Sequence, residues 1–150
     1  YQITLFGVWP DLVTLYALFF ILYGNHKEGG YIPVMLLGLL RDVFSIGVPG
    51  TYAILYGLLH KLLAGRKGIA YRDSAIALVV LGAFAVFAVN FGYYMLLVVN
   101  KLGSGLGYGV WRSALMSMVS APLMPVLVLG MSALLELLRV EKTKEGCFNI

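Results

Sequence analysis

Charged residues are scarce in this sequence, and their scarcity excludes an ordinary soluble domain. Only 12% of the 150 residues are charged and 61% are hydrophobic, with a mean hydropathy of +0.90. A soluble domain carries roughly 25% charged residues and roughly 45–50% apolar ones. A soluble fold of this size cannot bury so much apolar surface, whereas a lipid bilayer can cover it. We therefore expect an integral membrane protein.

Cysteine and histidine are nearly absent, which argues against disulfide and metal chemistry. The one cysteine, Cys147, cannot form an internal disulfide or a metal cluster, and we interpret it as an incidental thiol. His26 and His60 lie on different segments without carboxylate or cysteine neighbours at ligand spacing, so no metal site or cofactor is expected. No nucleophile–base pair or carboxylate dyad is recognisable, and we expect a protein that is not an enzyme.

Long apolar runs dominate what the sequence does contain. Five of them, separated by polar turns, cover residues 9–23, 31–46, 51–64, 74–100 and 113–138. The runs are too long and too uniformly apolar for the ~10-residue alternating strands of a membrane barrel. The sequence therefore predicts an all-α, polytopic membrane helical bundle with five spans. The second and third runs are short, and each covers only about 21–24 Å of a hydrocarbon core that is ~30 Å thick.

Proline, glycine and charge mark where these helices start and stop. Pro10 and Asp11 open the first run, because proline is tolerated in a first helical turn and an acid suits the positive helix end. Pro122 and Pro125 are expected to kink or locally break the fifth run. The glycine-rich segment 101–112 reads as a flexible loop, and residues 139–150 as a charged tail of a single domain spanning 1–150.

The net charge of +4 does not indicate nucleic-acid binding, because lysine and arginine lie in short gaps between the apolar runs. This pattern is typical of topology determinants. Counted in alternate gaps, one side has eight basic residues and the other has only Arg41, Lys101 and Arg112. The positive-inside rule makes the richer side cytoplasmic, together with the C-terminal tail. The start of the chain is then outside, and we expect one more helix upstream of Tyr1, six spans in all.

Arg41 and Asp42 are the most informative pair, because ionisable groups inside an apolar run are costly and face protein or water. Adjacent helical residues point about 100° apart, so the two need not pair with each other. The spacing of Asp42 to Ser45 and Gly47 suits a carboxylate that accepts backbone N–H bonds in a tight turn. Turn stabilisation, contact with a partner or ligand, and proton relay all remain open for this pair.

Two further features concern helix packing. Small residues form a stripe along the fourth run, at Gly82, Ala83, Ala85, Ala88 and Gly92. Such a stripe lets helices approach closely, within the chain or with a partner. Near the end of the fifth run, Glu136 and Arg139 have the i,i+3 spacing of a local ion pair.

The first half of the chain resembles a known family. Trp9-Pro10-Asp11-Leu12 opens a helix, a polar turn ends in Glu28-Gly29, and residues 38–53 read Gly-Leu-Leu-Arg-Asp-Val-Phe-Ser-Ile-Gly-Val-Pro-Gly-Thr-Tyr-Ala. This pattern is similar to the bacterial rod shape-determining protein MreD family, which typically shows Pro-Asp-Leu and a Gly-Leu-Leu-x-Asp-x-x-Ser-x-x-Pro-x-Gly-like hairpin. The likeness covers about residues 9–65. Arg41 stands where that family has an apolar residue, and Pro49 and Gly50 are adjacent rather than separated.

The resemblance implies a function that composition and spacing do not supply. It implies a multi-pass protein of the bacterial inner membrane, with a fold similar to the substrate-binding subunits of energy-coupling-factor transporters. It also implies a non-enzymatic scaffold of peptidoglycan synthesis in the cell-elongation machinery, which binds the single-span protein MreC and works with MreB, RodA and a penicillin-binding transpeptidase. The candidate contact residues are Arg41, Asp42, Ser45, Pro49 and Gly50. The rival hypothesis is a small-molecule or lipid-binding subunit of a transporter, since short Gly/Pro-interrupted runs can mark a site at membrane depth.

Overall fold

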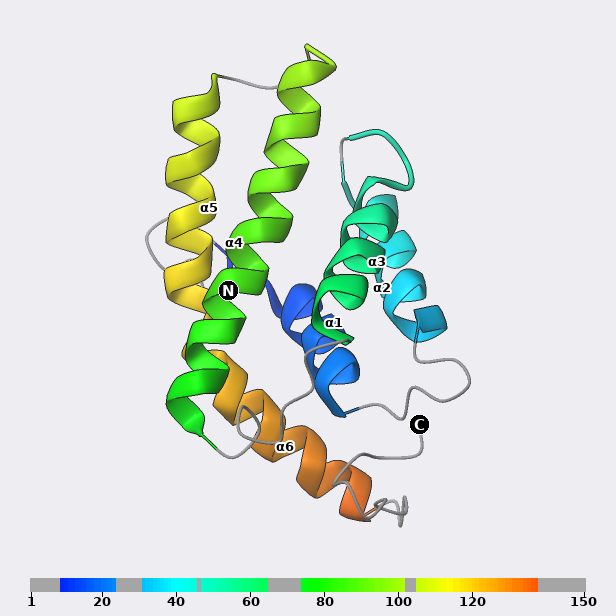
Figure 1. Cartoon of the computed structure of the whole chain (residues 1–150), viewed down its shortest axis with the longest axis vertical. Coiled ribbons are helices and arrows are strands. Elements are labelled where there is room, and N and C mark those ends of the chain that lie inside the picture. The colour runs from blue at the N-terminus through cyan, green and yellow to red at the C-terminus, as the bar shows by residue number, and fades with distance from the viewer. Residues whose placement is uncertain (1–8, 24–30, 46, 65–73, 102–104, 138–150) are drawn as a thin grey trace.

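The computed structural model describes residues 9–23, 31–45, 47–64, 74–101 and 105–137. Within these ranges the chain forms six helices and no strands, so the expected all-helical class is confirmed for this part of the chain. The helices are α1 (Leu12–Tyr23), α2 (Tyr31–Val43), α3 (Thr51–Ala64), α4 (Ala75–Val99), α5 (Leu106–Ser120) and α6 (Leu123–Leu137) (Figure 1). The tail at residues 139–150, and with it the expected Glu136–Arg139 pair, lies outside the described residues.

Two helix ends differ from the expected ones. Pro10 precedes α1 and does not lie in its first turn, and Asp11 caps the helix because its Oδ1 accepts the backbone N–H of Thr14 at 3.1 Å. The second difference is at the C-terminus of α2, which ends at Val43, whereas the predicted apolar run continues to Ile46. The chain turns there because the N–H of Phe44 bonds the carbonyl of Arg41 and that of Ser45 bonds the carbonyl of Asp42, each at 3.1 Å.

The fifth apolar run is two helices. α5 and α6 are bent by 47° at a break that contains Pro122, whereas Pro125 lies in the first turn of α6, where a missing N–H costs little. The prediction of a loop over residues 101–112 is wrong from Leu106 onward, because α5 begins there. Gly109 has a packing role, since a Cβ at this position would lie 3.0 Å from the Cβ of Tyr94 on α4.

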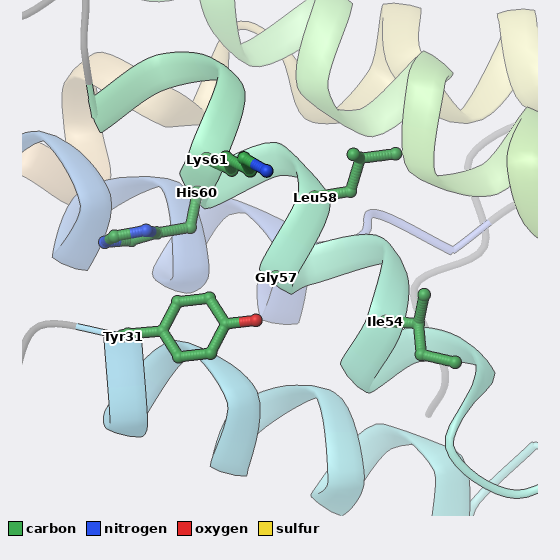
Figure 2. Close-up of a pocket in the computed structure, with 6 residues that line it drawn as sticks. All are labelled: Tyr31, Ile54, Gly57, Leu58, His60 and Lys61. Carbon is green, nitrogen blue, oxygen red and sulfur yellow. The ribbon is translucent and has the colours of Figure 1, made fainter.

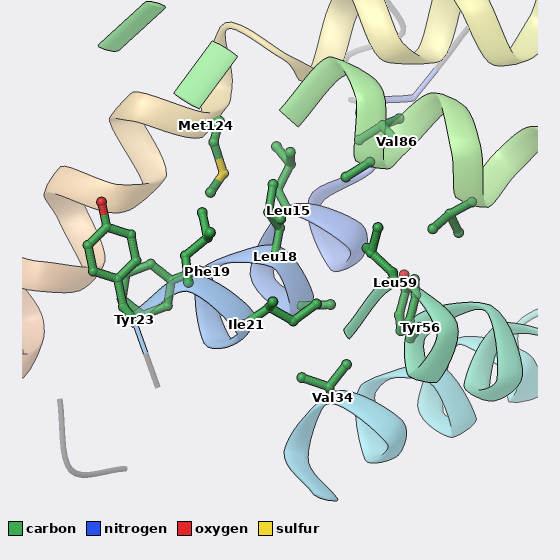
Figure 3. Close-up of a cluster of buried hydrophobic side chains, with 14 of the residues drawn as sticks. Leu15, Leu18, Phe19, Ile21, Tyr23, Val34, Tyr56, Leu59, Val86 and Met124 are labelled. Carbon is green, nitrogen blue, oxygen red and sulfur yellow. The ribbon is translucent and has the colours of Figure 1, made fainter. Parts of the chain in front are cut away.

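α1 lies at the centre of the bundle. The α2–α3 hairpin flanks it on one side, the antiparallel pair α4 and α5 lies on the other, and α6 crosses one end (Figure 1). Leu15, Leu18, Phe19 and Ile21 of α1 are fully buried. Figure 3 shows them facing Val34, Tyr56, Leu59, Val86 and Met124 from four other helices. Other helices surround α1, and this agrees with the apolar side chains on nearly all of its faces.

Small residues allow three close helix contacts inside the chain. A Cβ on Gly82 would lie 3.1 Å from the Cβ of Met124, and one on Gly92 would lie 2.9 Å from a methyl carbon of Leu55. Ala85 is fully buried and Ala88 is half-buried on the same helix. The closest approach involves Gly38, where a Cβ would lie 2.5 Å from the Cα of Ala53. The α2 and α3 backbones therefore touch at Gly38.

The outer surface carries large apolar side chains on every described helix, including Ile32, Leu36, Leu58, Phe84 and Leu129, which are 53% to 70% exposed. By length and composition, α4 is the one described helix that could cross a membrane by itself. The bent pair α5–α6 meets the same test if it forms a single span.

Candidate functional site

A cluster of polar side chains lies in the centre of this apolar bundle, around the ion pair of Arg41 and Asp11. The Nη1 atom of Arg41 lies 2.5 Å from Oδ1 of Asp11. The side chains are 14% and 2% exposed, so this charge pair is almost completely removed from solvent. Arg41 comes from the last turn of α2 and Asp11 from the residue before α1. The ion pair therefore ties the central helix to the hairpin.

Asp11 is the acceptor that holds most of the cluster together. Its Oδ2 accepts hydrogen bonds from the hydroxyl of Thr14 and from Nδ2 of Asn90, both at 2.7 Å. Its backbone N–H donates to the hydroxyl of Ser120 at 2.8 Å. Asn90 lies in α4 and Ser120 ends α5, so the hydrogen bonds of Asp11 join α1, α4 and α5, and its ion pair with Arg41 adds α2. The carboxylate charge is therefore both paired and hydrogen-bonded, as a buried acid requires.

Arg41 uses its remaining donors within the same cluster. Nη1 also lies within hydrogen-bond distance of the Thr14 and Tyr56 hydroxyls, at 2.6 and 2.8 Å. Nη2 donates to Oδ1 of Asn90 at 3.2 Å, and the guanidinium carbon lies 4.0 Å from the centre of the Tyr52 ring. The hydroxyls of Tyr56 and Thr14 are 2.9 Å apart. One cation is thus recognised by side chains from α1, α3 and α4.

Asp42 does not pair with Arg41, although the two are adjacent in the sequence. Its Oδ1 accepts the N–H of Tyr52 at 3.0 Å and its Oδ2 accepts the N–H of Ala53 at 3.3 Å. Asp42 therefore caps the N-terminus of α3 across the hairpin, where a negative charge is favourable. The sequence predicts that Asp42 accepts N–H groups of the turn directly after it. In the structure, the donors to Asp42 are instead these two N–H groups of α3.

The other residues predicted for this hairpin lie nearer the surface. The Ser45 hydroxyl donates to the carbonyl of Asp42 at 3.0 Å. Pro49 is exposed. Gly50 has a φ of +91°, which a residue with a side chain rarely adopts, and its carbonyl accepts the N–H of Ile54 in the first turn of α3. These residues shape the turn, whereas Arg41 and Asp42 reach the bundle interior.

A cavity of about 570 Å³ opens beside the polar cluster, between α2, α3, α4 and α5. We call it the arginine cavity, because both Arg41 and Arg112 line it. Its other polar lining residues are Ser45, Tyr52, Asn90, Tyr93 and Tyr94, and its apolar ones are Phe44, Leu97 and Met116. Among the described residues that line it, none is acidic. The cavity is therefore cationic on one wall and apolar on another.

A second hollow, of about 610 Å³, lies between the start of α2 and the middle of α3. Figure 2 shows the Tyr31 hydroxyl pointing toward Gly57, with His60 and Lys61 on the next turn of α3. The Tyr31 and His60 rings meet edge to face with centres 5.3 Å apart. The described part of the chain has no group of three or more His, Cys, Asp and Glu that could hold a metal ion.

Several members of the polar cluster and cavity were not identified from the sequence. Thr14, Tyr56, Asn90 and Ser120 were missed, and Arg112 was considered only as a topology determinant. A usable signal was present, because each of the first four is a polar side chain inside an apolar run. Thr14 also follows Asp11 at the spacing of a helix cap.

Comparisons of the chain with protein-family models, with curated proteins and with solved structures found no match.

Proposed function

We propose that this chain is a multi-pass protein of the bacterial inner membrane that scaffolds peptidoglycan synthesis by binding a single-span, MreC-like protein. On this proposal it belongs to the cell-elongation machinery, resembles the MreD family and catalyses no reaction. RodA, a penicillin-binding transpeptidase and MreB would be further members of the assembly.

The inverted distribution of side chains is the observation that carries the membrane part of the proposal. Leu36, Val80 and Leu129 are 58%, 63% and 70% exposed on three different helices. Asp11, Thr14 and Asn90 are at most 5% exposed. Water favours the opposite arrangement, since exposed apolar area costs about 25 cal/mol per Å². A bilayer favours the observed one, because it solvates apolar side chains and leaves polar groups to pair internally.

The position of the polar cluster along α4 supports the proposal that it lies inside the membrane-spanning part of the bundle. Asn90 is separated by fifteen residues from the start of α4 and by nine from its end. At about 1.5 Å per residue, these distances are about 22 and 14 Å, so a spanning α4 places Asn90 within the hydrocarbon region. Side chains that satisfy one another there fix how the helices pack. A fixed arrangement with apolar outer faces suits a protein that holds others in place.

Topology can be tested without introducing a labelling site, because Cys147 is the single cysteine of the 150-residue sequence. In spheroplasts, a membrane-permeant maleimide is expected to label Cys147, whereas an impermeant maleimide is not. The matched control combines Lys101→Cys with Cys147→Ser, and the impermeant reagent should label it. Labelling of Cys147 by the impermeant reagent in intact spheroplasts would contradict the proposed orientation.

Partner binding is tested by co-purification with the MreC-like single-span protein of the same organism. The complex should survive extraction in a mild detergent. A photocrosslinking residue placed in turn at Leu36, Val80, Phe84 and Leu129 samples exposed faces of α2, α4 and α6. Crosslinks concentrated on one face support a specific partner. No crosslink at any position, or equal crosslinks at all of them, would contradict the scaffold proposal.

A further inference from the structure

Arg112, which lines the arginine cavity, has no acidic partner within the described part of the chain. Its Nη1 donates to the Tyr108 hydroxyl one turn earlier in α5, at 3.0 Å. Among the described residues, the ion pair within 4.0 Å joins Arg41 to Asp11, and Arg112 has no such carboxylate. A guanidinium carries five N–H donors, so most of those on Arg112 are free for a ligand. The side chain is half-buried, so the lower local dielectric strengthens its attraction to an anion relative to an open surface.

Arg41, the other arginine that lines the cavity, has a different role. Arg41 already bonds Asp11, Thr14, Tyr56 and Asn90, so it contributes one wall of the cavity and few free donors. Asp42, the nearest acid along the chain, does not line the cavity, and both its oxygens accept N–H bonds from α3. The local field at the free end of Arg112 therefore favours an anion.

The opposite wall is apolar. Phe44, which is 83% exposed, Leu97 and Met116 continue the cavity onto the outer surface of the bundle. A volume of about 570 Å³ greatly exceeds one phosphate group, and it lies within the ~300–1,000 Å³ typical of ligand sites. The shape and chemistry together fit a molecule with one anionic group and an attached apolar part.

We propose that the arginine cavity binds the phosphate headgroup of an anionic amphiphile, with Arg112 as its direct ligand and the apolar wall against its chain. Arginine suits phosphate because its planar fork donates two parallel hydrogen bonds. This inference rests on the membrane embedding proposed above and is independent of the MreC-like partner.

The test measures binding of dihexanoyl phosphatidylglycerol to the purified chain in an uncharged detergent, by native mass spectrometry or calorimetry. Dihexanoyl phosphatidylcholine is the zwitterionic control, and glycerol phosphate is the soluble one. We expect saturable binding of the phosphatidylglycerol, several-fold weaker binding of the phosphatidylcholine, and little binding of glycerol phosphate. Arg112→Gln should weaken phosphatidylglycerol binding about tenfold, the size expected for one charge-assisted contact.

Two further variants separate a site from a surface effect. Lys101→Gln removes one charge at an exposed position on the same predicted side and should leave binding unchanged. Met116→Trp fills the cavity without changing charge and should weaken binding as Arg112→Gln does. Equal losses in Lys101→Gln and Arg112→Gln, or full binding by Met116→Trp, would overturn the proposal. Glycerol phosphate binding as tightly as the lipid would overturn the amphiphile and assign the cavity to a soluble phosphate.

The failure of the inference is distinguishable from that of the proposed function. A chain that fractionates with membranes but ignores phosphatidylglycerol refutes the lipid site alone. A chain that does not enter the membrane refutes the embedding on which both depend.

Discussion

Removing one partner of the Arg41–Asp11 ion pair should strongly destabilise the bundle. Asp11→Asn removes the negative charge, leaving Arg41 with neutral acceptors only. The new amide also places a donor where Oδ2 accepts from Asn90 and Thr14 at 2.7 Å, so one of these contacts becomes a clash between donors. Breaking one side of a buried pair costs about 3–5 kcal/mol. We expect a loss in this range for Asp11→Asn and for Arg41→Met.

The double variant is the decisive measurement. Removing both charges leaves no unpaired ion, so Asp11→Asn with Arg41→Met should be destabilised by about 2 kcal/mol less than the sum of the single variants. Unfolding of the detergent-solubilised chain by a titrated denaturing detergent, followed by tryptophan fluorescence, gives the four free energies. Trp111, in α5, is one tryptophan whose fluorescence reports on unfolding.

A control cycle uses Asp42, which is adjacent to Arg41 in sequence but bonds Tyr52 and Ala53 instead. Asp42→Asn combined with Arg41→Met should show a smaller coupling than the Asp11 cycle, because no ion pair joins Asp42 to Arg41 and the two share only contacts with Tyr52. An additive Asp11 cycle, or a larger coupling in the Asp42 cycle, would refute the pairing of Arg41 with Asp11.

Three further predictions concern local contacts, and the same unfolding measurement checks each. Gly38→Ala should cost about 1–3 kcal/mol, because the new Cβ meets the Ala53 backbone at 2.5 Å, whereas Gly130→Ala, with nothing within 4 Å, should be neutral or slightly stabilising. Equal effects would remove the argument from close packing. Asp42→Ala should cost about 1–2 kcal/mol through loss of the α3 cap, and Asp42→Asn less, an order that must hold if capping is its role. Ser113→Ala should be neutral or stabilising by up to about 1 kcal/mol, because the buried Ser113 hydroxyl has no hydrogen-bond partner among the described residues, while Ser117→Ala, which loses a bond to Ala114, should not stabilise.

The sequence predicts the positions of helices correctly where the length of an apolar run alone determines them. The runs at 51–64 and 74–100 match α3 and α4 to within a residue at each end, and Ser74 caps α4 with its hydroxyl. The break near Pro122 was also expected, since proline removes an N–H and clashes with the preceding turn. Leu106–Arg112 was misassigned because glycine disfavours an isolated helix. Packing of Gly109 against Tyr94 overrides that preference.

The candidate site was only partly predictable for a related reason. Arg41 is conspicuous as a charge within an apolar run, and its failure to pair with Asp42 follows from helix geometry. Its true partner lies thirty positions earlier in the chain, and Asn90 joins the cluster from forty-nine positions later. Such pairings depend on how whole helices pack, which local spacing does not determine. The sequence predicts Asp11 as a helix-start residue, and that role explains only its hydrogen bond with the backbone N–H of Thr14.

The same limit explains what the polar cluster contributes to this fold. In the membrane setting proposed above, apolar side chains on α1 do not distinguish one rotation or depth of the helix from another, because lipid tails are as apolar as neighbouring helices. The Asp11 carboxylate does distinguish them, since a shift of one turn, about 5.4 Å, would separate it from Arg41, Asn90 and Thr14. Each group would then be buried without a partner among apolar side chains, at a cost of about 1–3 kcal/mol or more. The register of the central helix is therefore set by a few polar contacts, while the apolar runs supply only the helices that these contacts align.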